Sequence, residues 1–312
     1  MIEETVQNGL AAVEEKLRAV VESDVAVLDE ASRHIIESGG KRLRPQLAIL
    51  TYLAAGGEDL ASFIPLAAAI ELVHTATLVH DDINDHSLTR RGNITVHARW
   101  GRTFALLTGD FLFTKVYELM APYGAQYNEI MAEATVQLVE GETLQAAAAK
   151  AGQMDRQTYK KIISRKTASL FAAAARMGAL LADGDEATVE ALDEYAHNLG
   201  LAFQIVDDIL DIIGDPEKMG KPVGSDVAQG MGALLLQNGR KRAPQDGSLV
   251  DDELDPFKQM MVRLRESGVV EIARAEAQEA AGRARSALQQ LPDSPARQEL
   301  ERLVDLVLER ER

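Results

Sequence analysis

The feature that most constrains the fold is the segment of residues 66–80, which has apolar residues on every side of a helix and follows Pro65. A helix that is apolar all round must be enclosed by other parts of the protein, as it is at the centre of a helical bundle. Proline is tolerated in the first turn of a helix, so we expect this helix to begin close to Pro65. The segment therefore predicts a bundle built around one buried helix.

Helical periodicity extends over most of the remaining chain, and glycine pairs at 39–40 and 56–57 act as stop signals. Aromatic residues make up only 4% of the chain, and there is no long strand pattern, fixed repeat or Pro-rich linker. The sequence therefore predicts one all-α domain over residues 1–312. Its other helices are expected over residues 3–37, 46–55, 101–120, 127–149, 155–181, 185–213, 227–237 and from the loop-like segment 238–255 to residue 312.

The charge of the chain limits its partners. Lys and Arg total 33 against 49 Asp and Glu, a net charge of −16, which disfavours nucleic acid and anionic membranes as partners. The absence of cysteine excludes disulfides and thiolate metal sites and is typical of a reducing compartment. No secretory signal and no transmembrane segment are evident, so we expect a cytoplasmic protein.

Two copies of one acidic motif stand out. Residues 81–85 (DDIND) and 207–211 (DDILD) both have the pattern DDxxD, and each follows apolar helical sequence. On a helix Asp81 shares a face with Asp85, and Asp207 with Asp211, so like charges repel there. One copy alone is most simply a solvated helix end. Two copies after buried helices favour divalent metal, and oxygen-only ligands favour Mg²⁺, which completes its shell with water and substrate phosphates.

Basic residues accompany both acidic motifs in this acidic chain. Residues 39–45 (GGKRLRP) concentrate three cations in a turn that begins with glycine. Arginine forks beside flexible backbone bind diphosphate groups well. The combination therefore predicts one diphosphate held through metal and another held by bases. The candidate bases are Lys41, Arg42, Arg44, Arg90, Arg91, Lys166 and Lys221.

The chain resembles the trans-isoprenyl diphosphate synthases, or polyprenyl synthetases, over essentially its whole length. The resemblance implies an all-α bundle around a deep central cavity. It also implies a prenyltransferase that condenses isopentenyl diphosphate with an allylic diphosphate (dimethylallyl, geranyl, farnesyl or geranylgeranyl) and releases pyrophosphate. The matching motifs are GGKRLRP at 39–45, LVHDDINDHSLTRRG at 78–92, GDFL at 109–112, RKTASLF at 165–171, FQIVDDILD at 203–211 and GDPEKMGKPVGSD at 214–226.

The resemblance also implies roles for individual residues. Three Mg²⁺ ions, for which Mn²⁺ could substitute, would be ligated by Asp81, Asp85 and Asp207. Asp82 and Asp211 would complete the acidic shells, with Asp208 as their partner. The allylic diphosphate would be held by Arg90, Lys166 and Lys221, and isopentenyl diphosphate by Lys41, Arg44, His74 and Arg91. The oxygens of Thr167 and Gln204 would face the developing carbocation.

Some residues have a simpler reading, and one region departs from the family. For His80 we favour a structural role in a buried helix, whereas for His74 we favour contact with substrate. After Lys221 the family commonly has a basic residue, a threonine and a proline at positions that are here Met231, Ala233 and Leu235. This departure affects the expected turnover rate more than the expected reaction, because both acidic motifs are intact.

Three alternatives remain open. A class I terpene cyclase would share the first acidic motif and the fold, but such enzymes replace the second motif and have no isopentenyl diphosphate site. A non-catalytic regulatory subunit of another synthase would have lost an acidic motif. A short-chain synthase, making farnesyl or geranylgeranyl diphosphate, differs only in product length.

The resemblance implies a homodimer, and the apolar residues in 66–80, 127–149 and 165–182 would supply its surface. Product length depends on residues along the helix before Asp81. Ala76 and Thr77 lie about 6–8 Å below that motif, and in the family Phe or Tyr there goes with short products. Here both are small and Val73, a turn lower, is medium-sized. This wall predicts an all-trans product of about C25–C40, since an isoprene unit adds roughly 5 Å.

Overall fold

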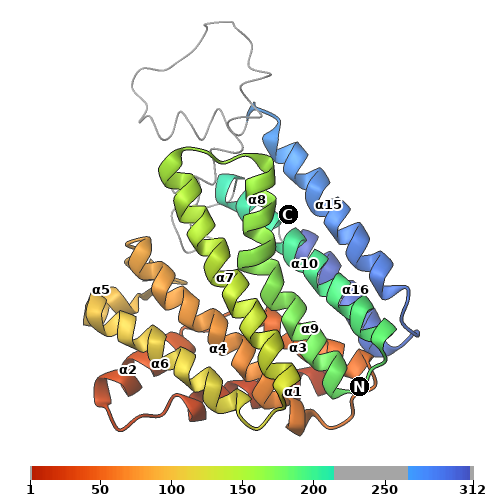
Figure 1. Ribbon diagram of the computed structural model, residues 1–312, viewed down its shortest axis with the longest axis horizontal. Coiled ribbons are helices and arrows are strands. Elements are labelled where there is room, and N and C mark those ends of the chain that lie inside the picture. The colour runs from red at the N-terminus through yellow and green to blue at the C-terminus, as the bar shows by residue number, and fades with distance from the viewer. Residues whose placement is uncertain (1, 214–265, 310–312) are drawn as a thin grey trace, which may run out of the picture.

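The computed structural model describes residues 2–213 and 266–309, and these form an all-α structure with one small hairpin in the described part. Figure 1 shows the helices side by side, with α4 between α6 on one side and α3 and α9 on the other. The elements are α1 (Ile2–Val20), α2 (Ala26–Glu37), α3 (Leu43–Ala54), α4 (Leu60–Asn84), β1 (Thr89–Arg90), β2 (Asn93–Ile94), α5 (Val96–Trp100), α6 (Arg102–Met120), α7 (Ala125–Ala151), α8 (Arg156–Ile163), η1 (Ser164–Ala168), α9 (Ser169–Leu181), α10 (Glu186–Ile213), α15 (Val269–Leu288) and α16 (Pro295–Glu309).

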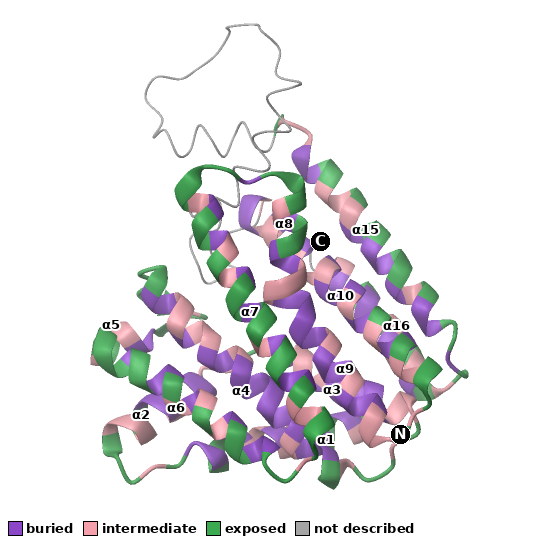
Figure 2. Cartoon of the chain, in the orientation of Figure 1, coloured by how far each residue is buried: buried purple, intermediate pink, exposed green. Residues whose placement is uncertain are grey.

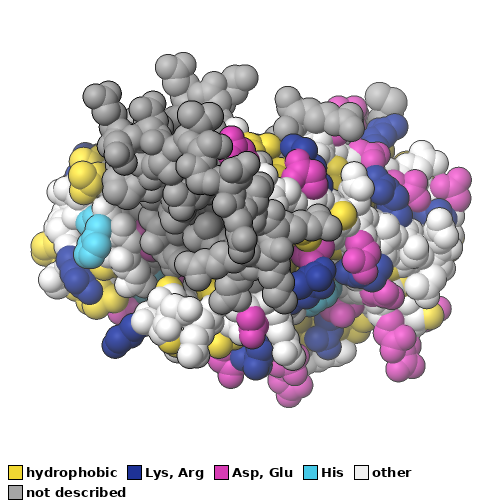
Figure 3. All heavy atoms as spheres, turned by 90° about the horizontal axis from the view of Figure 1, so that it is seen from above, with side chains coloured by type: hydrophobic (Ala, Val, Ile, Leu, Met, Phe, Trp, Pro, Cys, Tyr) yellow, Lys and Arg dark blue, Asp and Glu magenta, His cyan; other side chains and the backbone are white. Residues whose placement is uncertain are grey.

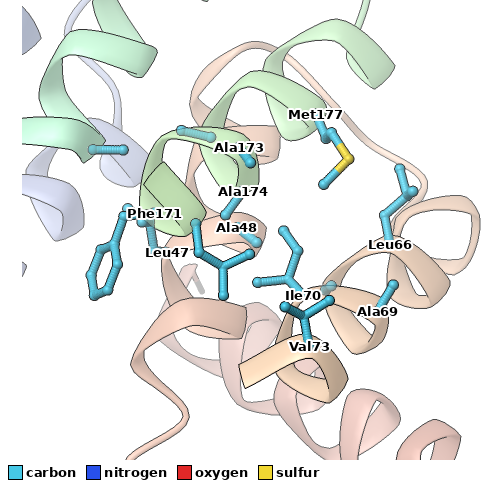
Figure 4. Packing of buried hydrophobic residues seen from close by; sticks show 14 of the residues in the cluster. Leu47, Ala48, Leu66, Ala69, Ile70, Val73, Phe171, Ala173, Ala174 and Met177 are labelled. Carbon is cyan, nitrogen blue, oxygen red and sulfur yellow. The ribbon is translucent and has the colours of Figure 1, made fainter. Parts of the chain in front are cut away.

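Helix α4 is the buried helix that the sequence predicts. Nearly all residues in 63–76 are buried (Figure 2), and they pack against α1, α3, α6 and α9. Figure 4 shows Ile70 and Val73 of this helix beside Leu47 of α3, with Ala174 of α9 close by. Because this segment lies in the core of its own chain, the expectation that residues 66–80 supply surface for a dimer is wrong.

The start of α4 differs from the prediction. The helix begins at Leu60, and the side chain of Asp59 caps it by accepting a hydrogen bond from the backbone N–H of Ala61 over 3.0 Å. Pro65 is therefore the sixth residue of the helix and does not mark its start. A good N-cap residue outweighs the weaker signal that a proline gives.

Helix α4 is also long and apolar enough by composition to cross a membrane, as is no other helix in the described part of the chain. Its most apolar window is 72% buried inside the protein. The charged residue within it, Glu71, accepts a hydrogen bond from Nη1 of Arg42 over 2.9 Å. The position of α4 in the core of the protein accounts for its apolar composition.

Two local features go beyond the predicted elements, and both carry predicted site residues. Strands β1 and β2 pair antiparallel, with Thr89 opposite Ile94, in a stretch for which the sequence predicts no helix. The segment expected as one helix over 155–181 is interrupted by the π-helical turn η1, which contains Lys166 and Thr167. The expected helix 227–237 and loop 238–255 lie outside the described residues.

Candidate active site

The first acidic motif lies at the C-terminal end of α4. Asp82 is only 1% exposed, whereas Asp81 is partly exposed and Asp85 is exposed. Asp82 accepts a hydrogen bond from Nε of Arg90 over 2.7 Å, and its Oδ2 atom is buried with no hydrogen-bond partner among the described residues. Asp82 thus anchors the hairpin that carries Arg90, and Asp81 and Asp85 are the accessible carboxylates of the motif.

The surroundings of Asp81 favour a bound cation. Burial raises the pKa of Asp81 to about 7; the charge of Lys166 opposes this rise, and Glu142 and Asp85 add to it. A carboxylate that holds its proton near neutral pH becomes charged readily when a further cation approaches. The oxygen-only ligands at this end of α4 suit a hard divalent ion.

Lys166 lies beside this motif. Its ammonium group forms an ion pair with Glu142 of α7 and donates a hydrogen bond to Oε1 of Gln145 over 3.3 Å. Burial by itself would lower the pKa of Lys166, but the charges of Asp81, Glu142 and Asp85 outweigh it, so this pKa is raised. Lys166 is therefore a lasting positive charge next to the first acidic motif.

Two glycines allow the neighbouring helices to approach η1 closely. A Cβ atom on Gly141 of α7 would lie 2.7 Å from the backbone nitrogen of Lys166, and one on Gly200 of α10 would lie 2.8 Å from Cα of Ala168. Real Cβ atoms do not approach backbone so closely, so any larger residue would push these helices away. The turn that carries Lys166 and Thr167 is thus held between α7 and α10. Single π-helical turns of this kind are frequent at functional sites.

The second acidic motif lies in the last turns of α10, which ends at the same end of the bundle as α4 (Figure 1). Asp211 is fully buried, and Asp207 and Asp208 are partly exposed. Asp208 accepts hydrogen bonds at both oxygens, from the hydroxyl of Tyr159 over 2.5 Å and from Nε2 of Gln204 over 2.9 Å. Burial, followed by the charge of Asp208, raises the pKa of Tyr159 well above its usual value, so the phenol keeps its proton.

Thr167 and Gln204 contact each other, as the resemblance implies for residues of one site. The hydroxyl of Thr167 donates to Oε1 of Gln204 over 2.7 Å. Phe203 precedes Gln204 on α10, and its ring lies 5.6 Å from that of Phe171 on α9. A polar pair beside aromatic rings is a suitable surrounding for a short-lived cation.

The three cations of the turn before α3 have different surroundings. Arg42 adopts a left-handed conformation and is buried in ion pairs with Glu14 and Glu71. Lys41 is exposed. The guanidinium of Arg44 lies 4.9 Å from the centre of the Phe171 ring, and its Nε atom has no hydrogen-bond partner in residues 2–213 and 266–309. Arg42 therefore holds the turn, and the Nε atom of Arg44 suits a ligand.

The same turn contacts the hairpin. Arg91 donates a hydrogen bond to the carbonyl oxygen of Gly39, and a Cβ atom on Gly40 would lie 2.5 Å from Nη1 of Arg91. Burial lowers the pKa of Arg44 to about 10, with Arg91 adding to this and Glu71 and Asp207 opposing it. Arg44 is therefore close to the second acidic motif as well as to Arg91.

His74 belongs to the same cluster. Burial lowers its pKa well below the usual value, and the charges of Arg44 and Arg91 lower it further, so the ring is neutral at pH 7. His80, in contrast, packs against α6: its Nε2 atom lies 3.5 Å from Asp110, and Gly109 leaves room for the ring. The structural role expected for His80 agrees with this contact.

The geometry thus places many of the predicted site residues that the structure describes in two groups, one around each acidic motif. Lys166 and Arg90 lie beside the first acidic motif. Arg44 and Arg91 form a pair of cations that reaches the second, with the neutral ring of His74 close to both. No three acidic or histidine side chains of the described residues converge as a ready-made metal site. Magnesium commonly takes one or two protein carboxylates and fills its shell with substrate phosphates and water, so the residues present fit such an ion.

The remaining predicted residues have plainer surroundings. Val73 and Ala76 are fully buried, and Val73 belongs to the packed core in Figure 4. Thr77 is partly exposed, and its hydroxyl donates to the carbonyl oxygen of His74 over 2.8 Å. Lys221 and the unusual Met231, Ala233 and Leu235 lie outside the described residues.

Sequence reasoning missed Glu142, Gln145 and Tyr159. Their signal was weak, because none of them lies in the acidic or basic motifs that the sequence analysis singles out. Only the fold brings Glu142 and Gln145 to Lys166, and Tyr159 to Asp208. Figure 3 looks onto the end of the bundle and shows acidic and basic side chains interspersed on the part of the surface that is not drawn in grey.

Comparisons with known proteins agree with this geometry. A short chain isoprenyl diphosphate synthase of Methanothermobacter thermautotrophicus is 36% identical over 96% of this chain and 95% of its own. An octaprenyl diphosphate synthase of Escherichia coli is 34% identical over 100% of this chain and 98% of its own. The crystal structure of a polyprenyl synthase from Caulobacter crescentus, complexed with calcium and isoprenyl diphosphate, has a TM-score of 0.91 and 36% identity, covering 99% of this chain and 96% of that one.

The family model for polyprenyl synthetase matches residues 25–260. This match covers most of the chain and includes both acidic motifs and the turn at 39–45. The similarity of whole relatives extends it to both ends. The chain is a prenyltransferase of the polyprenyl synthetase family.

Proposed function

We propose that the chain condenses isopentenyl diphosphate with an allylic diphosphate and makes an all-trans polyprenyl diphosphate of about C25–C40. The observation that carries this proposal is that α4 and α10 finish at the same end of the bundle (Figure 1). Each ends in an acidic motif, and Lys166 and Arg44 lie beside these motifs. An enzyme that separates pyrophosphate from an allylic carbon needs this combination of metal ligands and fixed cations.

The two diphosphates would occupy different parts of the site. Mg²⁺ held by Asp81, Asp85 and Asp207 would neutralise the allylic diphosphate and make pyrophosphate a better leaving group. Three ions per site and substitution by Mn²⁺ are part of this proposal. The bases proposed to contact the allylic diphosphate are Arg90, Lys166 and Lys221, and those proposed for isopentenyl diphosphate are Lys41, Arg44, His74 and Arg91.

The residues between the diphosphates would then act on the carbon skeleton. Ionisation leaves a positive charge on the allylic carbon, and the double bond of isopentenyl diphosphate attacks it before a proton is lost. Thr167 and Gln204 would stabilise the positive charge through their dipoles. Phe171 and Phe203 would exclude water, which would otherwise capture the cation.

Product length is proposed from the residues before Asp81. Ala76 and Thr77 are small, so they leave room for a growing chain where a large aromatic residue would block it. The names of the relatives support both long and short products, since an octaprenyl synthase and a short chain synthase resemble the chain to a similar degree. The range of about C25–C40 therefore rests on the side chains.

A cytoplasmic homodimer completes the proposal. Apolar side chains stand out into solvent along α6 and along α7, and exposed apolar side chains of this kind favour association with a second copy. Phe104, Leu106 and Leu107 are between 43% and 50% exposed, and Val136 and Val139 are each 57% exposed.

The direct test is product analysis with the purified chain alone. The chain would be incubated with Mg²⁺, labelled isopentenyl diphosphate and each allylic primer, and the products separated by chromatography. A ladder ending near C25–C40 is expected. A dominant C15 or C20 product would favour the short-chain alternative, a cyclic hydrocarbon the terpene cyclase, and no incorporation the non-catalytic subunit.

A further inference from the structure

A chain of hydrogen bonds crosses the site from a residue that has no assigned role. It begins at Tyr159 on α8, whose hydroxyl donates to Oδ2 of Asp208 over 2.5 Å. Nε2 of Gln204 donates to the other oxygen of the same carboxylate over 2.9 Å. Oε1 of Gln204 then accepts from the hydroxyl of Thr167 over 2.7 Å. Three separate elements, α8, α10 and η1, are joined in this way.

The chemistry of each group determines which one donates and which one accepts along this chain of hydrogen bonds. A carboxylate only accepts hydrogen bonds, so Asp208 requires the NH₂ group of Gln204 and not its carbonyl oxygen. The carbonyl oxygen of Gln204 must then face Thr167, whose single hydroxyl proton it accepts. The lone pairs of the Thr167 hydroxyl oxygen then point away from Gln204. Each group thus sets the orientation of the next.

We infer that Tyr159 is a positioning residue that acts through Asp208 and Gln204 to turn the oxygen of Thr167, and not its proton, toward the reacting carbons. This inference rests on the proposed function, in which Thr167 faces the allylic cation. A hydroxyl oxygen stabilises a neighbouring positive charge, whereas a hydroxyl proton opposes it. Orienting this dipole in advance removes the need to reorganise it during the reaction.

The same bonds define the surroundings of Asp208 within the second acidic motif. Both of its oxygens are used by donors from the protein, on Tyr159 and Gln204. Asp208 therefore holds the amide group of Gln204 in a fixed orientation. This agrees with the partner role that the sequence resemblance implies for Asp208. Tyr159 is the additional residue, and it holds Asp208 in place.

The test replaces Tyr159 by phenylalanine, which removes one hydroxyl and keeps the ring. Turnover of labelled isopentenyl diphosphate should fall by about tenfold, while KM for both substrates stays within about twofold, because the diphosphate sites are untouched. Tyr195→Phe is the matched control. Tyr195 is also buried, but its hydroxyl donates to the carbonyl oxygen of Leu300 over 2.7 Å, away from the site. It should lower the melting temperature and leave kcat unchanged.

A double-variant cycle separates positioning from general loss of packing. Because Tyr159 is inferred to act through Thr167, Tyr159→Phe should have little further effect on kcat in a Thr167→Val protein. An unchanged kcat in Tyr159→Phe, or a full additional loss in the double variant, would overturn the inference while leaving the proposed function intact.

A second readout does not depend on turnover. The melting temperatures of the wild type, the two single variants and the double variant report on the hydrogen-bond chain itself. The loss in the double variant should be smaller than the sum of the two single losses, because the first substitution already breaks the chain. Additive losses would overturn the inference even if the wild type proved inactive, an outcome that would separately refute the proposed function.

Discussion

The ammonium group of Lys166 forms an ion pair with the carboxylate of Glu142, directly beside Asp81. Glu142 adds to the effect of burial on Asp81, whose pKa is raised to about 7, and Lys166 opposes it. Glu142, which belongs to neither acidic motif, thus helps to set the charge of the first one.

At limiting Mg²⁺, activity should increase as the pH rises through about 7, because a metal ligand must lose its proton and Asp81 keeps its proton below its pKa of about 7. Glu142→Gln removes a negative charge that raises this pKa, so the acidic limb of the profile should move to lower pH. Glu140→Gln is the control, since Glu140 lies on the same helix but pairs with Arg165 over 2.9 Å. A limb that stayed in place in Glu142→Gln, or moved to higher pH, would contradict this account.

The two groups of bases should separate in steady-state kinetics. Lys41→Ala should raise mainly the KM for isopentenyl diphosphate, and Lys166→Ala should reduce kcat or weaken binding of the allylic substrate, by about tenfold or more in each case. Lys160, exposed on α8, offers a control substitution that should change neither constant. If Lys41→Ala leaves the KM for isopentenyl diphosphate untouched, the assignment of that site is wrong.

Much of this arrangement could be predicted from sequence, because its strongest signals are local. The apolar segment 66–80 predicts a buried helix, which is α4, and each DDxxD motif follows apolar helical sequence and lies at the end of a helix, α4 or α10. The rest depends on contacts between distant segments. Nothing near Tyr159 in the sequence indicates that it meets Asp208, and nothing in the helical pattern of 155–181 indicates that its middle adopts a π-helical turn between Gly141 and Gly200.

Product length should respond to the helix before the first acidic motif. Ala76→Phe places a large ring about 8 Å below Asp81, so the product should become shorter by one or more isoprene units. Because Ala76 is fully buried, Thr77→Tyr at a partly exposed position provides a second variant that disturbs the core less. Chromatography of the products measures their chain length. A product of unchanged length from two folded, active variants would place the wall elsewhere.

The exposed apolar residues of α6 and α7 should be covered by a second copy of the chain. Light scattering should give twice the 33.9 kDa mass of one chain at micromolar concentration. Leu107→Asp should shift the protein toward the monomer, because a buried unpaired charge is unfavourable. Ile272→Asp, at a residue that is 41% exposed on α15, should leave the dimer intact. A monomeric wild type would refute the dimer.

The central claim is that both acidic motifs serve one reaction, and turnover in single and double alanine variants tests it most directly. Asp81→Ala and Asp207→Ala should each reduce incorporation of isopentenyl diphosphate by orders of magnitude with the helical fold intact, and the double variant should lose little more than either alone. Asp24→Ala, at an exposed residue between α1 and α2, should remain fully active. Near-normal turnover in Asp81→Ala or Asp207→Ala would contradict the account.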